Sequence, residues 1–511
     1  MPFQIFLIIA ARNEGGLTTK IFICNYLHEK SKHFISSIFR FVFLGESKLT
    51  KNSYFNYPKT VAINRKICYN IRCVIIFILK GHIKMKTNEL IKAINEGKAD
   101  EMLLALYGEE DIAAQKIRYI KAIESFAELY GAEREVSAYS VAGRTEISGN
   151  HTDHNYGKVV AGSLNLDIIA VASPREDSVI RVKSEGFDED VVDFEVYNAP
   201  DASKYTSSAS IIAGMCAGMK KNGHSIGGFD AYTTSNVLKG SGISSSAAFE
   251  DMIGNILNHL YNDGKVDNVE IAMLSQYAEN VFFGKPCGLM DQVACAAGGV
   301  VSIDFADPTA PVIEKIDFDL SGAGYNLCIV NTGGNHADLG EDYASVPSEM
   351  KSVAEFFGKK VLRETDEEEV VKAIPALREK VGDRAIMRAL HFFNENRRVD
   401  RIKAALKKGD IDEFFADILE SGRSSFCYLQ NVFTTKNVSE QGVSLALLLA
   451  DKYLSGKKAA FRVHGGGFAG TIQAFVPSED AEGFRAYMDS ALGEGSCLIL
   501  RIRPYGAVKV I

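Results

Sequence analysis

The chain has 511 residues, of which 46% are hydrophobic and 24% charged, and its formal net charge is −8. These values are ordinary for a globular protein of about three domains by length, and they exclude a disordered, collagen-like or small disulfide-stapled chain. The longest apolar runs, such as Ile5–Ala11 and Val74–Leu79, are much shorter than the roughly 18 residues that span a bilayer, so no membrane segment is expected.

The nine cysteines form no CxxC pair and show no zinc-ligand spacing. An odd number of scattered cysteines in a chain of this length indicates reduced thiols rather than a disulfide framework. We therefore expect a cytoplasmic protein.

The charge is unevenly distributed along the chain. Residues 1–84 hold thirteen Lys and Arg residues against three Glu, a net charge of +10, whereas residues 85–511 hold 44 basic and 62 acidic residues, a net charge of −18. The basic segment shows no sustained helical or strand period and no paired helix caps. It can be an extension that contacts nucleic acid or membrane, a targeting peptide, or translated upstream sequence that is not native protein.

We favour the third interpretation of residues 1–84, because their Phe, Ile, Lys, Asn and Tyr residues have AT-rich codons and the character of the sequence changes at once at Met85. The segment is then a non-native or disordered extension. The acidic body that follows gives no reason to expect nucleic acid or membrane as a partner.

Within the body, helical spacing predicts two helices first, and strands then alternate with helices without a regular βαβ order. The predicted helices are Glu89–Leu106, Ala113–Tyr130, Ala247–Leu260, Val269–Phe283, several up to about Gly422, and Asp480–Leu492. The predicted strands are Val136–Val141, Lys158–Ser173, Phe229–Asn236, Val300–Phe305, Asn326–Asn331, Ala459–Val463, Thr471–Val476 and Ser496–Arg503. This order favours an α+β protein of two layered domains, 85–310 and 311–511, that share a cleft.

The first of three glycine-rich motifs is Leu238-Lys-Gly-Ser-Gly-Ile-Ser-Ser-Ser, between a predicted strand and a predicted helix. Gly240 and Gly242 let the backbone approach an anion, and Ser244–Ser246 lie where free N–H groups and the helix dipole attract phosphate. It is not a Walker A loop, since the GxxxxGK[ST] pattern is missing. The alternative is a plain turn followed by a Ser N-cap.

The second motif, Gly143–Gly157, concentrates Arg144, Asn150, His151, Asp153 and His154 in a Gly-rich turn after a predicted strand. Polar groups at this density suit the recognition of sugar hydroxyls. The histidines can instead be surface loop residues, or they can ligate a metal together with the aspartate.

The third motif is Arg462-Val-His-Gly-Gly-Gly-Phe-Ala-Gly, between two predicted strands. Four glycines in six residues indicate unusual backbone angles or close approach to a ligand, although a bulged hairpin turn explains them as well. Two carboxylates complete the candidates. Asp291 lies in a predicted apolar loop and can orient or deprotonate a hydroxyl, or it can be a cap; Glu279 lies on a predicted helix and can be a solvated charge.

Taken together and in this order, the motifs resemble those of the GHMP small-molecule kinases, and within them the galactokinase group. Gly143–His154 is similar to Gly-Arg-x-Asn-Leu-Ile-Gly-Glu-His-x-Asp-Tyr, Gly240–Ala247 to Gly-Gly-Gly-Leu-Ser-Ser-Ser-Ala, and Gly465–Gly470 to Gly-Gly-Gly-Phe-Gly-Gly. Pro286–Gln292 and His391–Val399 also resemble this group. The resemblance extends from about residue 138 to the end.

The resemblance implies a two-domain GHMP kinase fold, with an N-terminal domain like ribosomal protein S5 domain 2, a ferredoxin-like C-terminal domain, and the active site in the cleft between them. It implies ATP and a sugar as partners, Mg²⁺ as cofactor, and a monomer or weak homodimer. Asp291 would be the catalytic base or orienting group, and Arg144 would keep it ionised and offset phosphoryl charge.

The resemblance also assigns the binding residues. The phosphates of ATP would be bound by Gly240, Ser241, Gly242, Ser244, Ser245, Ser246, Gly466 and Gly467. The sugar would be bound by Asn150, His151, Asp153, Gly288 and Tyr343, and Mg²⁺ by Ser245 and Glu279.

Four departures from the family pattern concern the sugar. Asn150 replaces the family Glu, which accepts a hydrogen bond from a sugar hydroxyl, and Glu146-Ile147-Ser148 replaces Asn-Leu-Ile. His154 and His464 replace a Tyr and a Thr. A changed hydroxyl pattern can change the preferred sugar. Galactose is the expected substrate of a sugar-1-kinase; arabinose, N-acetylgalactosamine or another hexose, and a non-catalytic sugar sensor, are the alternatives.

Overall fold

The computed structural model describes residues 4–13, 16–25, 85–237, 243–285, 287–334 and 339–511, with only the backbone described in the first two ranges. The chain divides into two compact units, Met1–Ile78 and Leu79–Ile511. In the first unit, β1 (Gln4–Asn13) and β2 (Gly16–Asn25) pair antiparallel. These strands were not predicted, because their apolar runs are continuous and do not alternate. The expectation that residues 1–84 are not native stays a prediction.

The second unit begins with three helices that cover one face of a sheet. They are α3 (Thr87–Asn95), α4 (Asp100–Tyr107) and α5 (Ile112–Tyr130). The sequence predicted a single helix over Glu89–Leu106, but the chain turns at Gly97, where φ is +79°. Glycine adopts this angle without the steric cost that other residues meet, so the helix breaks there.

The sheet beneath these helices has nine strands, and two long strands form its centre. Its strands are β3 (Met85–Lys86), β4 (Glu135–Ser148), β5 (Lys158–Pro174), β6 (Val179–Ser184), β7 (Glu189–Asp193), β8 (Phe229–Ser235), β9 (Val300–Asp304), β10 (Val312–Ile316) and β15 (Ala507–Lys509). The order is β10-β9-β5-β8-β6-β7, and β4 pairs with β5, β3 and β15. All these pairings are antiparallel except β6 with β8.

The predicted strand Val136–Val141 is much longer than expected. β4 continues through Ser148, so the first half of the second glycine-rich motif is strand rather than turn. The β4–β5 register shifts between Ala142 and Arg144 and again between Glu146 and Ser148. Such bulges bend a strand and redirect its side chains.

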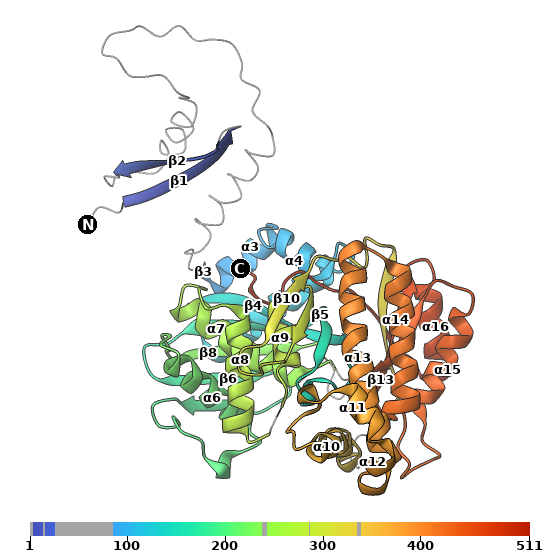
Figure 1. Ribbon diagram of the computed structural model, residues 1–511. Coiled ribbons are helices and arrows are strands. Elements are labelled where there is room, and N and C mark those ends of the chain that lie inside the picture. The colour runs from blue at the N-terminus through green and yellow to red at the C-terminus, as the bar shows by residue number, and fades with distance from the viewer. Residues whose placement is uncertain (1–3, 14–15, 26–84, 238–242, 286, 335–338) are drawn as a thin grey trace. The chain divides into compact units, whose positions relative to one another are not determined.

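The other face of the sheet packs against helices that carry the first motif and Asp291 (Figure 1). They are α6 (Ser208–Lys221), α7 (Ser245–Tyr261), α8 (Asn268–Tyr277) with its π-helical continuation η3 (Ala278–Phe283), and α9 (Met290–Ala297). Neither α6 nor α9 was predicted. Asp291 therefore lies in the first turn of a helix, not in an apolar loop.

A second, four-stranded antiparallel sheet has the order β12-β13-β11-β14. Its strands are β11 (Tyr325–Asn331), β12 (Ala460–His464), β13 (Thr471–Pro477) and β14 (Cys497–Leu500). α15 (Gly442–Leu454) and α16 (Ala481–Leu492) share a core with one face of it, and α14 (Ile411–Ser424) packs on the other face through Phe414 and Phe475.

The remaining helices surround α13 (Asp383–Lys408), which lies beside α14 (Figure 1). They are α10 (Gly340–Phe356), α11 (Glu367–Lys372) and α12 (Ile374–Lys380). Among the described residues, no helix has the length and apolar character that crossing a membrane requires.

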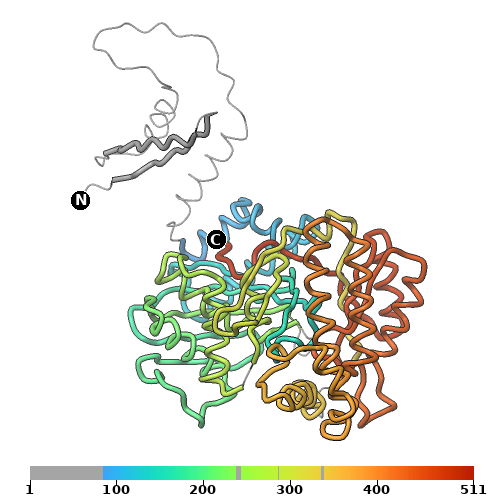
Figure 2. The backbone as a smooth tube through the Cα atoms, viewed as in Figure 1, coloured from blue at the N-terminus to red at the C-terminus, as the bar shows by residue number. Residues whose placement is uncertain are grey.

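The C-terminal segment returns to the first sheet. β15 pairs with β4, and Ala138 at the centre of that sheet exchanges backbone hydrogen bonds with Val510 and Ile511. Figure 2 shows this red segment beside the blue segments that follow residue 85. β10 also belongs to the first sheet. The two layered halves are therefore not contiguous in sequence, and the division at residue 310 stays a prediction.

Candidate active site

An ion pair between β4 and α9 lies at the centre of the candidate site. Arg144 Nε lies 2.8 Å from Asp291 Oδ1, and Arg144 Nη2 lies 3.0 Å from Oδ2, so the pair is bidentate. The bulge in β4 precedes Arg144 and brings its backbone N–H within 3.1 Å of the Ile243 carbonyl oxygen. The two sequence motifs, 147 residues apart, thus meet at one carboxylate.

The end of the serine-rich loop contacts the same carboxylate. Ser244 has left-handed backbone angles (φ +60°, ψ +59°) immediately before α7, and its hydroxyl donates to Asp291 Oδ2 at 2.5 Å. Its side chain makes no hydrogen bond to the helix N-terminus, so Ser244 is not a plain N-cap. Gly240, Ser241 and Gly242 lie outside the described residues.

These contacts determine the charge of Asp291. Burial raises the pKa of this carboxyl group, but the charge and hydrogen bonds of Arg144, together with the Ser244 hydroxyl, outweigh burial and lower the pKa below its ordinary value. The side chain is 36% exposed and faces a cavity. Asp291 is therefore ionised near neutral pH and able to accept a hydrogen bond from a hydroxyl.

The cavity has a volume of about 260 Å³ and collects residues from all three motifs. It is lined by Arg144, Glu146, His151, Asp153, His154, Ser246, Glu279, Lys285, Cys287, Gly288, Met290, Asp291, Gln292, Gly465 and Gly466. Of the predicted site residues, eight lie in this lining: Arg144, His151, Asp153, Ser246, Glu279, Gly288, Asp291 and Gly466.

One wall of the cavity consists of the turn after β4 and the third glycine-rich loop. His151 Nε2 lies 2.9 Å from the Gly466 carbonyl oxygen. Burial lowers the pKa of His151 to about 4, so the ring is neutral, and because a carbonyl only accepts, Nε2 carries the proton. The opposite nitrogen, Nδ1, is then an acceptor.

Gly288 lies directly against Asp153. A Cβ atom on Gly288 would lie 2.5 Å from Asp153 Oδ2, a distance that requires one of them to move. The close approach explains a glycine at this position. Both residues line the cavity.

Five other predicted residues lie near this cavity but not in its lining. Ser245 begins α7, and Tyr343 on α10 donates to the Gly467 carbonyl oxygen at 2.9 Å while its ring packs edge-on against Phe468. Ser244 acts on Asp291 as described. Gly467 has φ +78° and lies against Asn431, where a Cβ atom would meet the carbonyl oxygen at 2.0 Å. These residues shape the serine-rich loop before α7 and the third glycine-rich loop.

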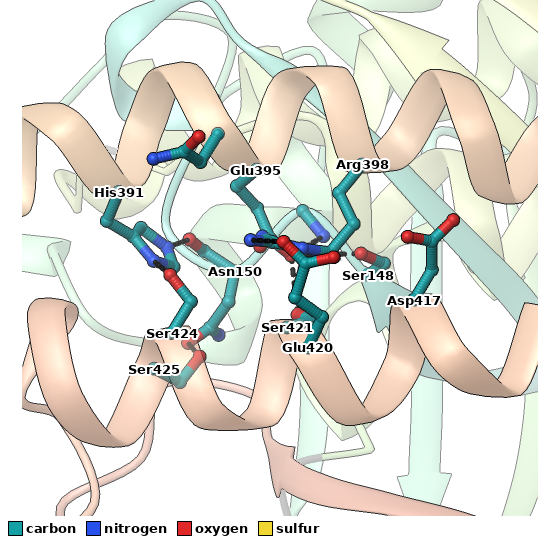
Figure 3. A network of polar contacts seen from close by, with 12 residues as sticks. Ser148, Asn150, His391, Glu395, Arg398, Asp417, Glu420, Ser421, Ser424 and Ser425 are labelled. Carbon is teal, nitrogen blue, oxygen red and sulfur yellow. Dashed lines mark hydrogen bonds and ion pairs between the residues drawn. The ribbon is translucent and has the colours of Figure 1, made fainter.

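Asn150, the fifth, is fully buried behind the cavity, in a polar network with α13 and α14 (Figure 3). Its carbonyl oxygen lies 3.0 Å from His391 Nε2, and its side-chain oxygen accepts from Ser425 and Asn431. Glu395, which lies on α13 as His391 does, accepts hydrogen bonds from Ser148 Oγ and from the Gly149 N–H. The helices therefore hold the turn in place.

Among the described residues, no group of three or more His, Cys, Asp and Glu side chains is arranged to hold a metal ion. The alternative of a metal site at His151, Asp153 and His154 is therefore not supported. Glu279 offers a different arrangement. Its Oε1 lies 3.4 Å from Lys285 Nζ, and its Oε2 accepts from Gln292 at 3.0 Å on the cavity wall.

Gln292 also donates to Glu250 Oε2, at 3.1 Å. Burial, and after it the charge of Glu279, raises the pKa of Glu250 to about 8, so Glu250 is largely protonated near neutral pH. Glu279 and Ser246 line the same cavity, and a carboxylate with a serine hydroxyl is a donor set that suits Mg²⁺. This ion usually takes one or two carboxylates and completes its shell with phosphate and water.

The sequence analysis did not assign Glu146, Lys285, Cys287 or Gln292 to the site. Glu146 was noted only as a departure from the family pattern. The other three flank Asp291 and Gly288 within a few residues, and this proximity is a signal that could have identified them.

Comparisons with known proteins cover the residues that form this site. The GHMP kinases N terminal domain matches residues 206–299, and the galactokinase galactose-binding signature matches residues 124–174. A galactokinase from Streptomyces coelicolor is 31% identical over 374 residues, which cover 72% of this chain and 91% of that protein. The chain belongs to the galactokinase family. The signature includes Arg144, Asn150, His151 and Asp153, and the GHMP match includes Ser244 and Asp291.

Solved structures show the same fold as this galactokinase-family chain. Lactococcus lactis galactokinase, complexed with galactose, has a TM-score of 0.64 at 24% identity and covers 77% of this chain and all of its own (100%). Mevalonate kinase from Methanococcus jannaschii has a TM-score of 0.51 at 12% identity and covers 72% of this chain and 98% of its own. The expected two-domain GHMP kinase fold of the α+β class is confirmed.

Proposed function

We propose that this protein is a galactokinase, which transfers the γ-phosphoryl group of ATP to the anomeric hydroxyl of galactose and releases galactose 1-phosphate and ADP. The observation that carries the proposal is the convergence of Arg144 and Ser244 on Asp291, at a cavity lined by His151 and Asp153. Membership in the galactokinase family supports it.

In this proposal Asp291 accepts a hydrogen bond from the anomeric hydroxyl and directs its oxygen at the γ-phosphorus. The new O–P bond forms as the bond to the ADP oxygen breaks, and the hydroxyl proton passes to Asp291 late in the transfer. Because the Arg144 pair lowers the pKa of Asp291, the carboxylate acts more through orientation than as a strong base.

The remaining residues bind and orient. Arg144 offsets charge on the transferring group, and the loop at residues 240–246 with Gly466 and Gly467 binds the phosphates through backbone N–H groups. His151, Asp153 and Gly288 bind the sugar. Mg²⁺ would be held by Glu279 and Ser245 or its neighbour Ser246, and it would neutralise phosphate charge. We further propose a cytoplasmic enzyme that acts as a monomer or weak homodimer.

The test is a coupled assay of ADP release with ATP, Mg²⁺ and a panel of galactose, arabinose, N-acetylgalactosamine and glucose. We expect the highest kcat/KM with galactose. Asp291→Asn should retain sugar binding and lose turnover about 10³-fold or more, since orientation and proton acceptance are both impaired. A higher kcat/KM with another sugar would reassign the substrate, and binding of galactose without any turnover would favour a sensor.

A further inference from the structure

Glu146 shares one face of β4 with Arg144. Side chains two residues apart point to the same side of a strand, and the β4–β5 register is regular between these two positions. Since Arg144 faces the cavity, Glu146 does as well, and it belongs to the lining although only 4% of the residue is exposed.

Within the part of the chain that the structure describes, only one oxygen of the Glu146 carboxylate has hydrogen-bond partners. Oε1 accepts from Asn150 Nδ2 at 2.9 Å and from the buried Arg462 Nη2 at 3.1 Å. Oε2 accepts no hydrogen bond from any described residue. It differs from the side-chain oxygen of Gln292, which also has no partner but is fully enclosed. Oε2 therefore opens onto the cavity.

Asn150, in contrast, has no hydrogen-bonding capacity left for a ligand. Its NH₂ group donates to Glu146 Oε1 and to the Gly465 carbonyl oxygen at 2.7 Å. Both of these partners only accept, so the orientation of the amide is fixed. Its oxygen accepts from Asn431 at 2.8 Å and from Ser425 at 3.2 Å, and the residue is fully buried.

We infer that Glu146, and not Asn150, supplies the carboxylate that selects the sugar, through a hydrogen bond from one sugar hydroxyl to Oε2, and that Asn150 is a positioning residue for it. This inference rests on the proposed sugar kinase function. The chain has Glu and Asn where the family pattern has Asn and Glu, so the two residue types are exchanged within one hydrogen-bonded pair. Compared with the family pattern, the carboxylate therefore lies on β4, the strand that carries Arg144, and not in the turn after it.

A carboxylate at this position makes a stringent demand on the substrate. A buried acceptor that is left without a hydrogen-bond partner loses the stabilisation of that bond without compensation from water. A sugar that lacks the contacted hydroxyl should therefore be rejected, whereas changes at other hydroxyls should matter less.

The experiment measures kcat/KM, and the Kd for the sugar by calorimetry, for galactose and its 2-, 3-, 4- and 6-deoxy derivatives. Wild type and Glu146→Gln are compared. Glu146→Gln should lower kcat/KM for galactose about 10- to 100-fold and should reduce discrimination against one deoxy sugar alone. The double variant Glu146→Asn with Asn150→Glu should recover part of the affinity that Glu146→Asn loses.

The matched control is Asp230→Asn, which also removes a buried carboxylate paired with arginine, but one on β8 and outside the cavity lining. It should lower stability and leave the ratios among the deoxy sugars as in wild type. If Glu146→Gln also leaves every ratio unchanged in an active enzyme, Glu146 is only the partner of Arg462 and the inference is wrong. If wild type neither binds nor phosphorylates galactose, the proposed function itself is wrong.

Discussion

At the scale of single residues, the ionisation of Asp291 depends first on Arg144 and then on the Ser244 hydroxyl. Burial alone raises the pKa of the carboxyl group, and Arg144 reverses that shift. The ionised form therefore persists below the ordinary titration range of Asp. The acid limb of a pH–rate profile reports this group if Asp291 orients the substrate.

We predict that Arg144→Ala moves the acid limb of kcat/KM to higher pH, because burial then raises the pKa of Asp291 while the cation that opposes it most strongly is gone. Turnover at neutral pH should also fall about 10²-fold or more, since the charge that offsets the phosphoryl group is lost. The measurement is kcat/KM for galactose from pH 4 to pH 9. An unmoved acid limb in a folded variant would contradict the assigned role of Asp291.

The close approach of Gly288 to Asp153 allows a second test. Gly288→Ala should push Asp153 away from its position and raise KM for the sugar about tenfold or more, with a smaller effect on the KM for ATP. Gly340→Ala is the control, because nothing lies within 4 Å of a Cβ atom there. Equal effects on the KM for the sugar and the KM for ATP would show that Gly288 and Asp153 do not bind the sugar.

The sequence predicted several residues of the candidate site, because the motifs carry Arg144, His151, Gly288 and Asp291 in a fixed order. It did not predict which side chains of one motif face the cavity. That choice depends on the bulges in β4, which lie before Arg144 and after Glu146 and so set the face that these two side chains share. It also depends on the turn after β4, which brings the carbonyl oxygen of Asn150 to His391 on α13. Bulges leave no clear mark in a pattern of residue types.

At the scale of elements, long apolar strands and helices with a clear apolar stripe were predicted, and α6, which is rich in small residues, was not. α6 contains Gly214 and Gly218, which lie against η3 and α8: a Cβ atom on Gly214 would be 2.8 Å from Ala278. In α6 the close packing of small residues replaces the stripe of large apolar residues by which a helix is recognised in a sequence. α9 has only eight residues and no side-chain cap.

The network between α13 and α14 is the element-scale support of the site. Glu395 is fully buried, pairs with Arg398, and accepts from Ser148, Gly149 and Ser421 (Figure 3). Burial raises the pKa of Glu395, but the charge of Arg398 and the other neighbours outweigh it and lower the pKa to about 2.

This shift predicts how stability depends on pH. A carboxyl group whose pKa is lower in the folded than in the unfolded chain stabilises the fold above the unfolded pKa, 4.5, and that stabilisation is lost as the pH falls toward 2. We expect Glu395→Gln to cost about 3–5 kcal/mol at pH 7 and less at pH 3. Urea unfolding at both pH values measures the difference.

Glu420→Gln is the matched control for this experiment. Glu420 also pairs with Arg398, at 3.2 Å, but its side chain is 42% exposed. A partly exposed ion pair is screened by water, so its loss should cost less than about 1 kcal/mol. Equal destabilisation by Glu395→Gln and Glu420→Gln would show that burial does not determine how much each carboxylate stabilises the fold.

At the scale of the whole molecule, two sheets share a chain that crosses between them more than once. The sequence predicted the mixture of strands and helices but not that β10 and β15 join the first sheet. β15 has only three residues, and such a short segment carries no period of its own. Its place is determined by contacts with residues more than 350 positions earlier.

We predict that deletion of residues 507–511 prevents folding of the body. The deletion removes the backbone partners of Tyr139–Val141 and leaves the side-chain amide of the buried Asn255 without its acceptor, the Val508 carbonyl oxygen. Each buried group left unpaired costs about 1–3 kcal/mol, against a typical total stability of about 5–15 kcal/mol. Solubility and circular dichroism of the truncated chain measure the effect.

Val508→Ala is the control for the deletion, because it keeps every backbone hydrogen bond of β15. It should fold and cost little, since Val508 is only partly buried. A truncated chain that folds and phosphorylates galactose would show that the first sheet does not need its last strand.

A sheet that is completed by a strand far along the chain has a particular order of events during synthesis. A ribosome releases β4 first, and its edge along Tyr139–Val141 stays unpaired until residues 507–509 have been translated. Unpaired strand edges on nascent chains favour misassembly, and chaperones recognise such intermediates. We therefore expect this sheet to close only after β15 has left the ribosome, and a polypeptide that stalls before β15 to be removed by quality control.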